Sequence, residues 1–175
     1  MDKILDLSLH RLETPIGELL VVCDPEGNLR AIDWTDYETR MHRLLRLHYQ
    51  SDGFRVEAAR KSTETTDAIG RYFAGEVTAI DALPVRTAGT GFQREVWRAL
   101  RQIDCGTTLS YAQLAGRIGR AIAVRAVGMA NGSNPIGIVV PCHRVIGANG
   151  SLTGYGGGIE RKRWLLAHER NSFTF

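Results

Sequence analysis

The sequence lacks any apolar run long enough to cross a bilayer, and it lacks the basic and then apolar stretch of a signal peptide. Acidic residues stand within Met1–Asp6, where such a peptide would need positive charge. With 43% hydrophobic and 23% charged residues, the composition also excludes a disordered chain. We therefore expect a globular cytoplasmic protein without a membrane partner.

Cysteine is scarce as well. Cys23, Cys105 and Cys142 are odd in number and far apart, whereas zinc sites and disulfide frameworks use closely spaced or paired cysteines. The spacing predicts a reduced compartment, with no metal and no cofactor.

Acidic residues are few in the second half of the chain. After Val85, twelve basic residues against four acidic ones leave a net charge of +8, and before it ten against fifteen leave −5. This asymmetry favours a polyanionic partner for the C-terminal half, although a solvated basic surface explains the charge equally well.

The N-terminal half is typical of a small mixed α/β domain. Alternating runs at 7–11, 19–22 and 29–32, separated by turn residues, predict an antiparallel meander. Helical spacing follows at 37–48 and 63–73, where Gly75 supplies a stop. The proline- and glycine-containing segment 81–90 marks a boundary, which predicts domains 1–85 and 86–175.

The C-terminal half is predicted to be mostly helical, which makes the whole chain α/β in the α+β sense. An amphipathic helix over 92–100 places Phe92, Val96 and Ala99/Leu100 on one face. A capping box, Ser110 with Gln113, starts a helix that ends near Gly119, and a helical run over 121–130 follows at once. The pair has the form of a helix-turn-helix, a pattern that is more often plain architecture than a DNA reader.

The candidate nucleophile is Cys142. An apolar, strand-like run beginning at Asn134 delivers it between Pro141 and His143, with Arg144 following. A buried cysteine is usually inert, but an adjacent imidazole and basic side chains lower the pKa of a thiol and can take its proton. Cys23 and Cys105 lack such neighbours, so we expect both to be structural.

His143 needs a carboxylate to fix its tautomer and to stabilise its protonated form. The predicted helix over 160–170 offers Glu160 and Glu169. Spacing does not choose between them, and both could instead lie on a solvated face.

Several motifs point to a known family. The strongest is Pro141-Cys142-His143-Arg144-Val145, with Arg125-Ala126-Val127-Gly128 and Asn134-Pro135 before it and Gly154-Tyr155-Gly156-Gly157-Gly158 after it. Others are Tyr72-Phe73-Ala74-Gly75, Phe92-Gln93-Arg94-Glu95-Val96-Trp97 and Trp164-Leu165-Leu166-Ala167-His168-Glu169. Over nearly its whole length the chain resembles O6-alkylguanine-DNA alkyltransferases, most closely the constitutive bacterial type without a phosphotriester-repair domain.

The resemblance implies a ribonuclease-H-like N-terminal domain with an antiparallel sheet and helices. It also implies a C-terminal domain that combines a helix-turn-helix with the active-site cysteine loop. The implied activity is DNA repair by irreversible, stoichiometric transfer of an alkyl group from O6 of guanine, and from O4 of thymine, to Cys142. The implied partner is double-stranded DNA containing O6-alkylguanine, which is flipped out of the helix. The implied protein is a monomer in solution that clusters on DNA.

The resemblance also assigns roles to residues around the thiol. His143 deprotonates Cys142 through a water, and Glu169 orients His143. Asn134 braces the turn that carries the cysteine, and Tyr111 contacts guanine N3 and supplies a proton as the base leaves.

A second group of residues is implied to bind the base and the DNA. The carbonyls of Cys142 and Val145 accept from the exocyclic amine of guanine, the N–H of Gly156 bonds O6, and Tyr155 closes one wall. Arg125 enters the stack that the base has left. The helix over 121–130 lies in the minor groove, where small residues such as Ala126 and Gly128 permit close approach.

The chain departs from the family pattern at the start of this helix. Relatives usually carry proline and then a small residue, where this chain has Ala121-Ile122, and Val124 replaces a usual Ala or Ser. Gly156 stands where relatives often carry Ser or Ala. The glycine is expected to admit bulkier adducts. The missing proline leaves the first residue of the helix and the DNA affinity open, because proline pre-organises a first helical turn.

Three other functions are compatible with parts of the sequence. Alkyltransferase-like damage-binding proteins share the fold but lack the acceptor cysteine. A helix-turn-helix regulator would bind undamaged DNA sequence-specifically, and a cysteine hydrolase would turn over repeatedly.

Overall fold

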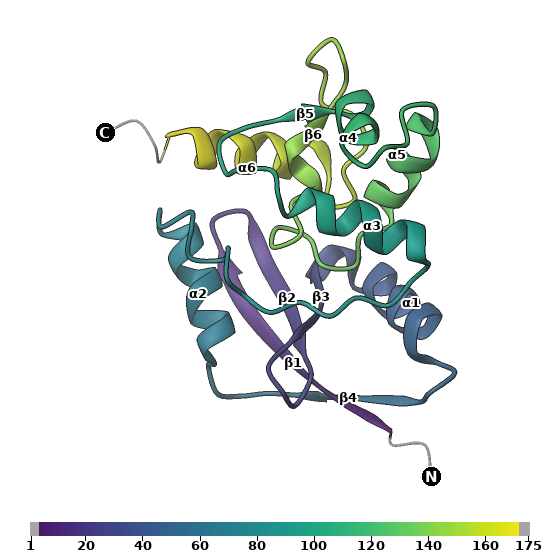
Figure 1. The fold of residues 1–175 in the computed structure, drawn as a ribbon. Helices are drawn as coiled ribbons and strands as arrows, with labels where there is room; N and C mark the ends of the chain where they lie inside the picture. The colour runs from purple at the N-terminus through teal and green to yellow at the C-terminus, as the bar shows by residue number, and fades with distance from the viewer. Residues whose placement is uncertain (1–3, 172–175) are drawn as a thin grey trace. The chain divides into compact units, whose positions relative to one another are not determined.

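The computed structural model describes residues 4–171, which divide into two compact units between Ala88 and Gly89. The first contains a sheet with helices and the second is mostly helical (Figure 1), so the predicted α/β fold class is confirmed. Among these residues no helix is both long and apolar enough to cross a membrane.

The N-terminal unit is built on four strands in the order β3-β2-β1-β4. Their bounds are Leu5–Thr14 for β1, Gly17–Cys23 for β2, Leu29–Trp34 for β3 and Phe54–Ala58 for β4. The first three pair antiparallel, as predicted from the meander pattern. β4 pairs parallel with β1 and was not predicted, although its five residues alternate half-buried apolar side chains with exposed ones as a strand does.

Helices cover both faces of this sheet. The short 3-10 helix η1 (Thr35–Tyr37) leads into α1 (Glu38–Tyr49), and α2 (Glu64–Phe73) lies on the other side (Figure 1). Every residue of β3 is therefore buried, as is β2 from Leu19 onward. A strand buried on both faces carries a continuous apolar run rather than an alternating one, which corrects the predicted alternation at 19–22.

Both predicted helices of this unit are confirmed within one or two residues. The Thr63 hydroxyl accepts from the N–H of Thr66 and closes a capping box, and Gly75 ends the segment with a φ of 115°. The segment after Leu83 returns to the sheet, where Leu29 exchanges backbone hydrogen bonds with residues 84 and 86. The structure therefore divides after Ala88, whereas the sequence placed the boundary after Val85.

As far as it is described, up to residue 171, the C-terminal unit contains four helices, a two-stranded parallel sheet and one 3-10 helix. In chain order they are α3 (Gly91–Leu100), β5 (Leu109–Ser110), α4 (Tyr111–Arg117), α5 (Val124–Gly132), η2 (Cys142–Arg144), β6 (Val145–Ile146) and α6 (Ile159–Asn171). Every predicted site residue lies in this unit.

The helix-turn-helix is present as α4 and α5. The Ser110–Gln113 capping box forms with both of its hydrogen bonds, and Gly119 turns the chain with a φ of 70°. The second helix begins at Val124 rather than Ala121, which corrects the predicted start. Ala123 has a non-helical ψ of 32° and no side-chain cap, so the preceding residues remain in a turn.

The run that leads to the cysteine is not a strand, which corrects the prediction. Residues 135–140 form turns in which Ile138 has a φ of 72°, a value incompatible with an extended chain. Asn134 holds the turns by accepting from the N–H of Ile136 at 2.9 Å and donating to the carbonyl of Val140 at 2.7 Å. Cys142 then begins the 3-10 helix η2.

Packing of α3 against α5 depends on Trp97, which the predicted apolar face omitted. The indole is buried and its N–H donates to the carbonyl of Ala130 at 2.8 Å. Phe92, which was predicted on that face, is only half-buried. The buried face of α3 consists of Val96, Trp97, Ala99 and Leu100.

We expect Trp97→Phe to lower the free energy of unfolding by about 1–3 kcal/mol, because it removes a buried hydrogen bond and leaves a cavity. Ala130 keeps its bonds from Ser133, so no carbonyl is left unsatisfied. Urea titration would measure the change, with Arg98→Lys on the exposed side of α3 as control. Equal stabilities of the two variants would contradict the role given to Trp97.

Candidate active site

Cys142 lies at the start of η2 with 8% of its surface exposed. Two asparagine amides hold the backbone on either side of it. Asn134 holds the preceding turn, and the buried Asn131 donates a long hydrogen bond of 3.5 Å to the carbonyl of Cys142 itself. The thiol is therefore presented by a turn whose backbone polar groups are satisfied by side chains from the end of α5 and the residues after it.

The side chain of His143 is fully buried and faces α6. Its Nε2 lies 2.7 Å from Oε1 of Glu169, and Glu169 is also fully buried. The alternative carboxylate, Glu160, is exposed and pairs with Arg163. The geometry therefore brings His143 together with Glu169 rather than with Glu160.

Arg144 binds the same carboxylate in a bidentate manner. Its Nη2 and Nε lie 2.9 and 3.0 Å from the two oxygens of Glu169, and its Nη1 donates to the carbonyl of Ile103 at 2.7 Å. The sequence suggested that Arg144 would add positive charge beside the thiol. Its pairing with Glu169 neutralises much of that charge.

Burial alone would raise the pKa of Glu169. The charge of His143 and the hydrogen bonds from His143 and Arg144 outweigh burial and hold this pKa far below its usual range. Glu169 is therefore a carboxylate at any physiological pH and accepts the Nε2–H of His143. Among residues 4–171 no group hydrogen-bonds the Nδ1 of His143, and this nitrogen carries a lone pair whenever the ring is neutral with its proton on Nε2.

Tyr111 and Lys162 meet at one carbonyl, that of Thr153. The Tyr111 hydroxyl donates to the carbonyl of Thr153 at 3.1 Å, and the Lys162 ammonium donates to the same carbonyl at 3.1 Å. Lys162 also donates to the carbonyl of Val145 at 2.6 Å. One fully buried lysine thus ties the segment before α6 to the strand that follows the cysteine.

The electrostatics of these two groups include the thiol. Burial raises the pKa of Tyr111, the bond to Thr153 opposes this, and a Cys142 thiolate raises it further. Burial lowers the pKa of Lys162, whereas the Cys142 thiolate raises it. Tyr111 therefore keeps its proton at neutral pH and can donate it.

Sequence reasoning missed Lys162, although a signal was present. Lys162, Leu165, Leu166 and Glu169 follow the spacing i, i+3, i+4, i+7, and they are the four buried residues of α6. Glu160 does not fit this spacing, because it precedes Lys162 by two residues and so lies off the buried face.

The predicted DNA-contacting residues lie on α5 and on the loop before α6. Arg125 and Ala126 are exposed, and within the described part of the chain no hydrogen bond or ion pair engages the Arg125 guanidinium. Gly128 lies against the Tyr111 ring, because a Cβ placed there would be 3.7 Å from it. Tyr155 and Gly156 are half-buried between β6 and α6.

The other two cysteines differ from Cys142. Burial and the neighbouring Asp24 raise the pKa of Cys23 to about 11, so it remains a thiol. Cys105 is half-buried in the turn after α3. Within residues 4–171 no three His, Cys, Asp or Glu side chains are grouped to hold a metal ion.

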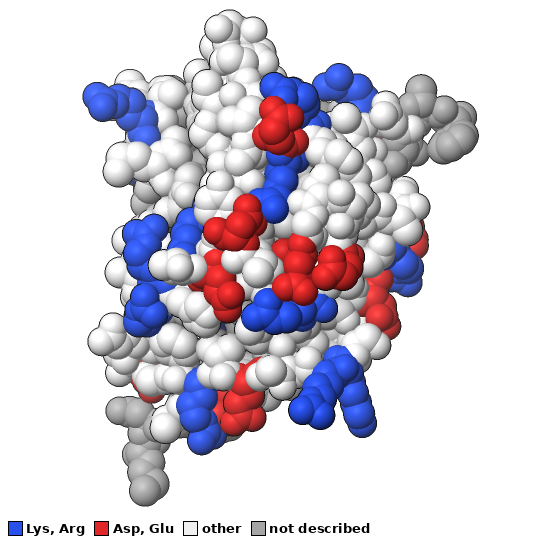
Figure 2. Space-filling model, turned by 180° about the vertical axis from the view of Figure 1, so that it is seen from behind, with Lys and Arg blue, Asp and Glu red and all other residues white. Residues whose placement is uncertain are grey.

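Basic side chains form no continuous patch on the face shown in Figure 2. Basic and acidic side chains are interspersed there with uncharged surface between them. Contact with a polyanion would therefore have to use another surface or rely on local groups such as Arg125.

Comparison with known proteins identifies both parts of the chain. A model of the ribonuclease-like domain of 6-O-methylguanine DNA methyltransferase matches residues 9–87, and a model of the DNA binding domain of the same family matches residues 91–171. The ribonuclease-like N-terminal domain that the resemblance implied is thereby confirmed.

Relatives match over nearly their full length. The methylated-DNA–protein-cysteine methyltransferase of Salmonella typhimurium is 54% identical, covering 95% of this chain and 97% of the relative. That of Mycolicibacterium paratuberculosis is 48% identical, covering 94% and 93%. The crystal structure of Mycobacterium tuberculosis OGT in complex with DNA has a TM-score of 0.78 at 40% identity and covers 94% of both chains. The chain therefore belongs to the 6-O-methylguanine DNA methyltransferase family.

Proposed function

We propose that this protein repairs DNA by moving a methyl or other alkyl group from O6 of guanine to the sulfur of Cys142. The observation that carries the proposal is the buried Cys142–His143–Glu169 arrangement, in a chain whose relatives are named for methyl transfer from DNA to a protein cysteine. The partner is double-stranded DNA containing O6-alkylguanine, and O4-alkylthymine is a second substrate.

Deprotonation of the thiol runs through His143. Because Glu169 accepts the hydrogen bond from Nε2–H, the proton of the neutral ring stays on Nε2. The lone pair of Nδ1 can then accept the thiol proton through an intervening water. Glu169 then stabilises the imidazolium that forms. A thiolate is a soft nucleophile, and it attacks the sp3 carbon of the alkyl group.

Departure of the base completes the transfer. A carbon–sulfur bond forms as the bond between the alkyl carbon and O6 breaks, and its electron pair goes to guanine. Tyr111 turns its hydroxyl from the Thr153 carbonyl and donates its proton to N3, so guanine leaves neutral. The imidazolium of His143 returns a proton to the tyrosinate through water, and overall the proton of the thiol is transferred to the base. The thioether that remains is stable to water, and one molecule repairs one lesion.

The base is held by backbone groups around the thiol. The carbonyls of Cys142 and Val145 accept from the exocyclic amine, the N–H of Gly156 donates to O6, and Tyr155 forms a wall. The Val145 carbonyl already binds Lys162, but a carbonyl oxygen has two lone pairs and can accept both donors. Lys162 thereby fixes the acceptor in place.

Duplex DNA must release the guanine before the thiol can reach it, at a cost of a few kcal/mol for unstacking and unpairing. We assign Arg125 to the vacated place in the stack, since its side chain is exposed on α5. Ala126 and Gly128 let α5 approach the minor groove closely. The protein acts as a monomer that clusters on DNA.

The proposal predicts that an O6-methylguanine duplex will add one methyl mass to the peptide containing Cys142. Each protein molecule should accept no more than one, because the thioether is not cleaved. Peptide mass mapping after incubation would measure this, with Cys142→Ser as the inactive control. Transfer by that control, or repeated turnover, would refute the mechanism.

We expect Glu169→Gln to slow transfer about 10²-fold, the lower end of what a positioned general base contributes, because an amide no longer stabilises the imidazolium. Lesion binding should persist, since Glu169 acts through His143. Single-turnover rates would measure the change, and Glu160→Gln is the matched control on the exposed side of the same helix. Wild-type rates in Glu169→Gln would exclude the network.

The same variant tests the electrostatics of the site. Because the pKa of Glu169 is lowered from 4.5 in the folded protein, its contribution to stability is complete above that pH and is lost as the pH falls below it. We expect Glu169→Gln to cost about 3–5 kcal/mol at pH 7, since Arg144 loses its buried partner, and less near pH 3. Urea unfolding at both pH values would measure this, and a pH-independent difference would contradict it.

Arg125→Ala should impair repair of a duplex and leave reaction with free O6-benzylguanine near the wild-type rate. The arginine stabilises the vacated stack, and the free base needs no flipping. Rates on both substrates would be compared in the same preparation. An equal loss on the free base and on the duplex would contradict this role.

A further inference from the structure

An exposed apolar stripe accompanies Arg125. The exposed large hydrophobic side chains among residues 4–171 are Ile4, Leu47, Ile122 and Met129. Ile122, in the turn before α5, is fully exposed, and Met129 is 77% exposed. Together with Arg125 and Ala126, which are also exposed, they form what we call the α5 stripe.

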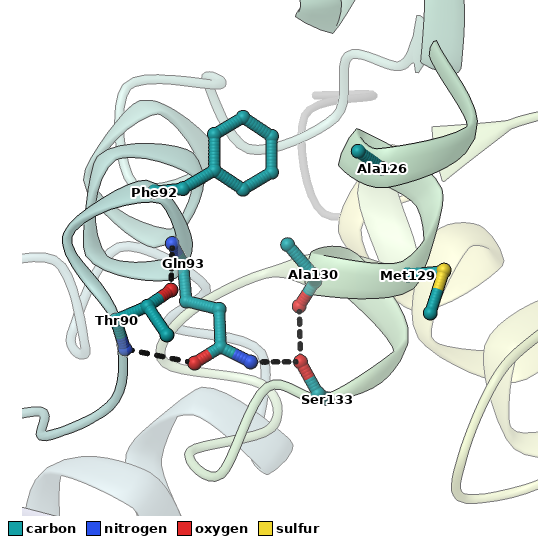
Figure 3. Close-up of a pocket in the computed structure, with 7 residues that line it drawn as sticks. All are labelled: Thr90, Phe92, Gln93, Ala126, Met129, Ala130 and Ser133. Carbon is teal, nitrogen blue, oxygen red and sulfur yellow. Dashed lines mark hydrogen bonds between the residues drawn. The ribbon is translucent and has the colours of Figure 1, made fainter. Parts of the chain in front are cut away.

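The stripe borders a hollow between α3 and α5 with a volume of about 320 Å³. Its lining is Thr90, Phe92, Gln93, Ala126, Met129, Ala130 and Ser133 (Figure 3).

The polar side chains in this lining bind one another. Gln93 accepts from the backbone of Thr90 at 2.9 Å and donates to Ser133 at 3.2 Å, and Ser133 donates to the carbonyl of Ala130 at 3.1 Å (Figure 3). The surface offered to an occupant is then the Phe92 ring, the alanine methyls and the Met129 side chain. It suits apolar contact rather than phosphate binding.

The partner is indicated by what surrounds the stripe. Arg125 lies inside it, and the chain after Val85 carries a net charge of +8, which complements a polyanion. The proposed function places this same helix in the minor groove. Proteins that bend DNA from the minor groove insert isoleucine and methionine among other apolar side chains between base steps.

The spacing along α5 agrees with the geometry of DNA. Met129 follows Arg125 by four residues, which is ~6 Å along a helix axis at 1.5 Å per residue. Stacked base pairs are ~3.4 Å apart, so Met129 lies nearly two base steps from the position of Arg125 if the helix follows the groove. Ile122 lies three residues before Arg125, in the turn that leads into α5.

We propose that Ile122 and Met129 flank Arg125 as apolar contacts to the minor groove, packing on deoxyribose and base edges on either side of the extruded nucleotide. The inference rests on the proposed function and adds two residues to its DNA-binding surface. These contacts carry no charge and are shared by all base pairs. They supply affinity that depends neither on salt nor on sequence.

The first test measures affinity for an O6-methylguanine duplex at several salt concentrations, with Cys142→Ser in every protein so that no transfer occurs. We expect Ile122→Ser and Met129→Ser each to weaken binding about tenfold, equivalent to ~1.4 kcal/mol. The dependence on salt should stay unchanged, because no phosphate contact is lost. Leu47→Ser, at another exposed leucine, is the matched control and should bind as before.

The second test asks where Met129 acts. With 2-aminopurine placed two base pairs from the lesion and protein at saturation, Met129 packed on the edge of the probe should change its fluorescence, and Met129→Ser should leave it as in free duplex. Because both changed residues are exposed, melting temperatures should remain unchanged.

Unaltered affinity in both serine variants, or a loss accompanied by a reduced salt dependence, would overturn the inference. Self-association of the wild type that both changes abolish, measured by sedimentation without DNA, would assign the stripe to a second copy and also overturn it. The proposed function fails separately, if wild-type protein does not become methylated on Cys142.

Discussion

The C-terminal unit depends on one buried carboxylate. Glu169 binds the imidazole that follows the cysteine and the guanidinium that follows the imidazole, and so joins α6 to η2. Burying a charge costs free energy unless hydrogen-bond partners replace the lost water. Here three N–H donors, from the adjacent residues His143 and Arg144, bind the Glu169 carboxylate. The same oxygen of Glu169 accepts from His143 and from Arg144. The buried Arg144–Glu169 ion pair therefore also sets the orientation of the His143 ring.

Lys162 extends the same principle to the strand that follows the cysteine. Its ammonium is fully buried and binds two carbonyls, one on β6 and one on the segment before α6. Tyr111 hydrogen-bonds one of those carbonyls, so the proposed proton donor and the proposed amine acceptor are fixed by a single side chain. Lys162 is assigned no contact with the thiol or the base. It nevertheless determines where the Tyr111 hydroxyl and the Val145 carbonyl lie, and both of these are assigned to contact the base.

Sequence patterns predicted the elements that local interactions determine. The capping box at Ser110 was predicted, because its hydrogen bonds join residues three apart, and the helix that begins after Thr63 was predicted from helical spacing. The strand β4 and the turns after Asn134 were not, because pairing with β1 and a left-handed Ile138 depend on distant parts of the chain. The choice of Glu169 over Glu160 was within reach, since helical spacing already separates the buried face of α6 from its exposed one.

The turn before the cysteine keeps a β-branched residue in left-handed backbone, with Ile138 at φ 72° and 1% exposed. Such a conformation costs ~1–3 kcal/mol, while burying an isoleucine side chain contributes ~1.5–3 kcal/mol. The two terms nearly cancel. Glycine would relieve the backbone strain but would leave a cavity in the core. A larger or polar residue would neither relieve the strain nor fit the buried apolar space. Backbone strain and side-chain burial thus oppose each other at this position, and a substitution there would alter how readily the loop that carries the nucleophile opens, without changing any group that reacts.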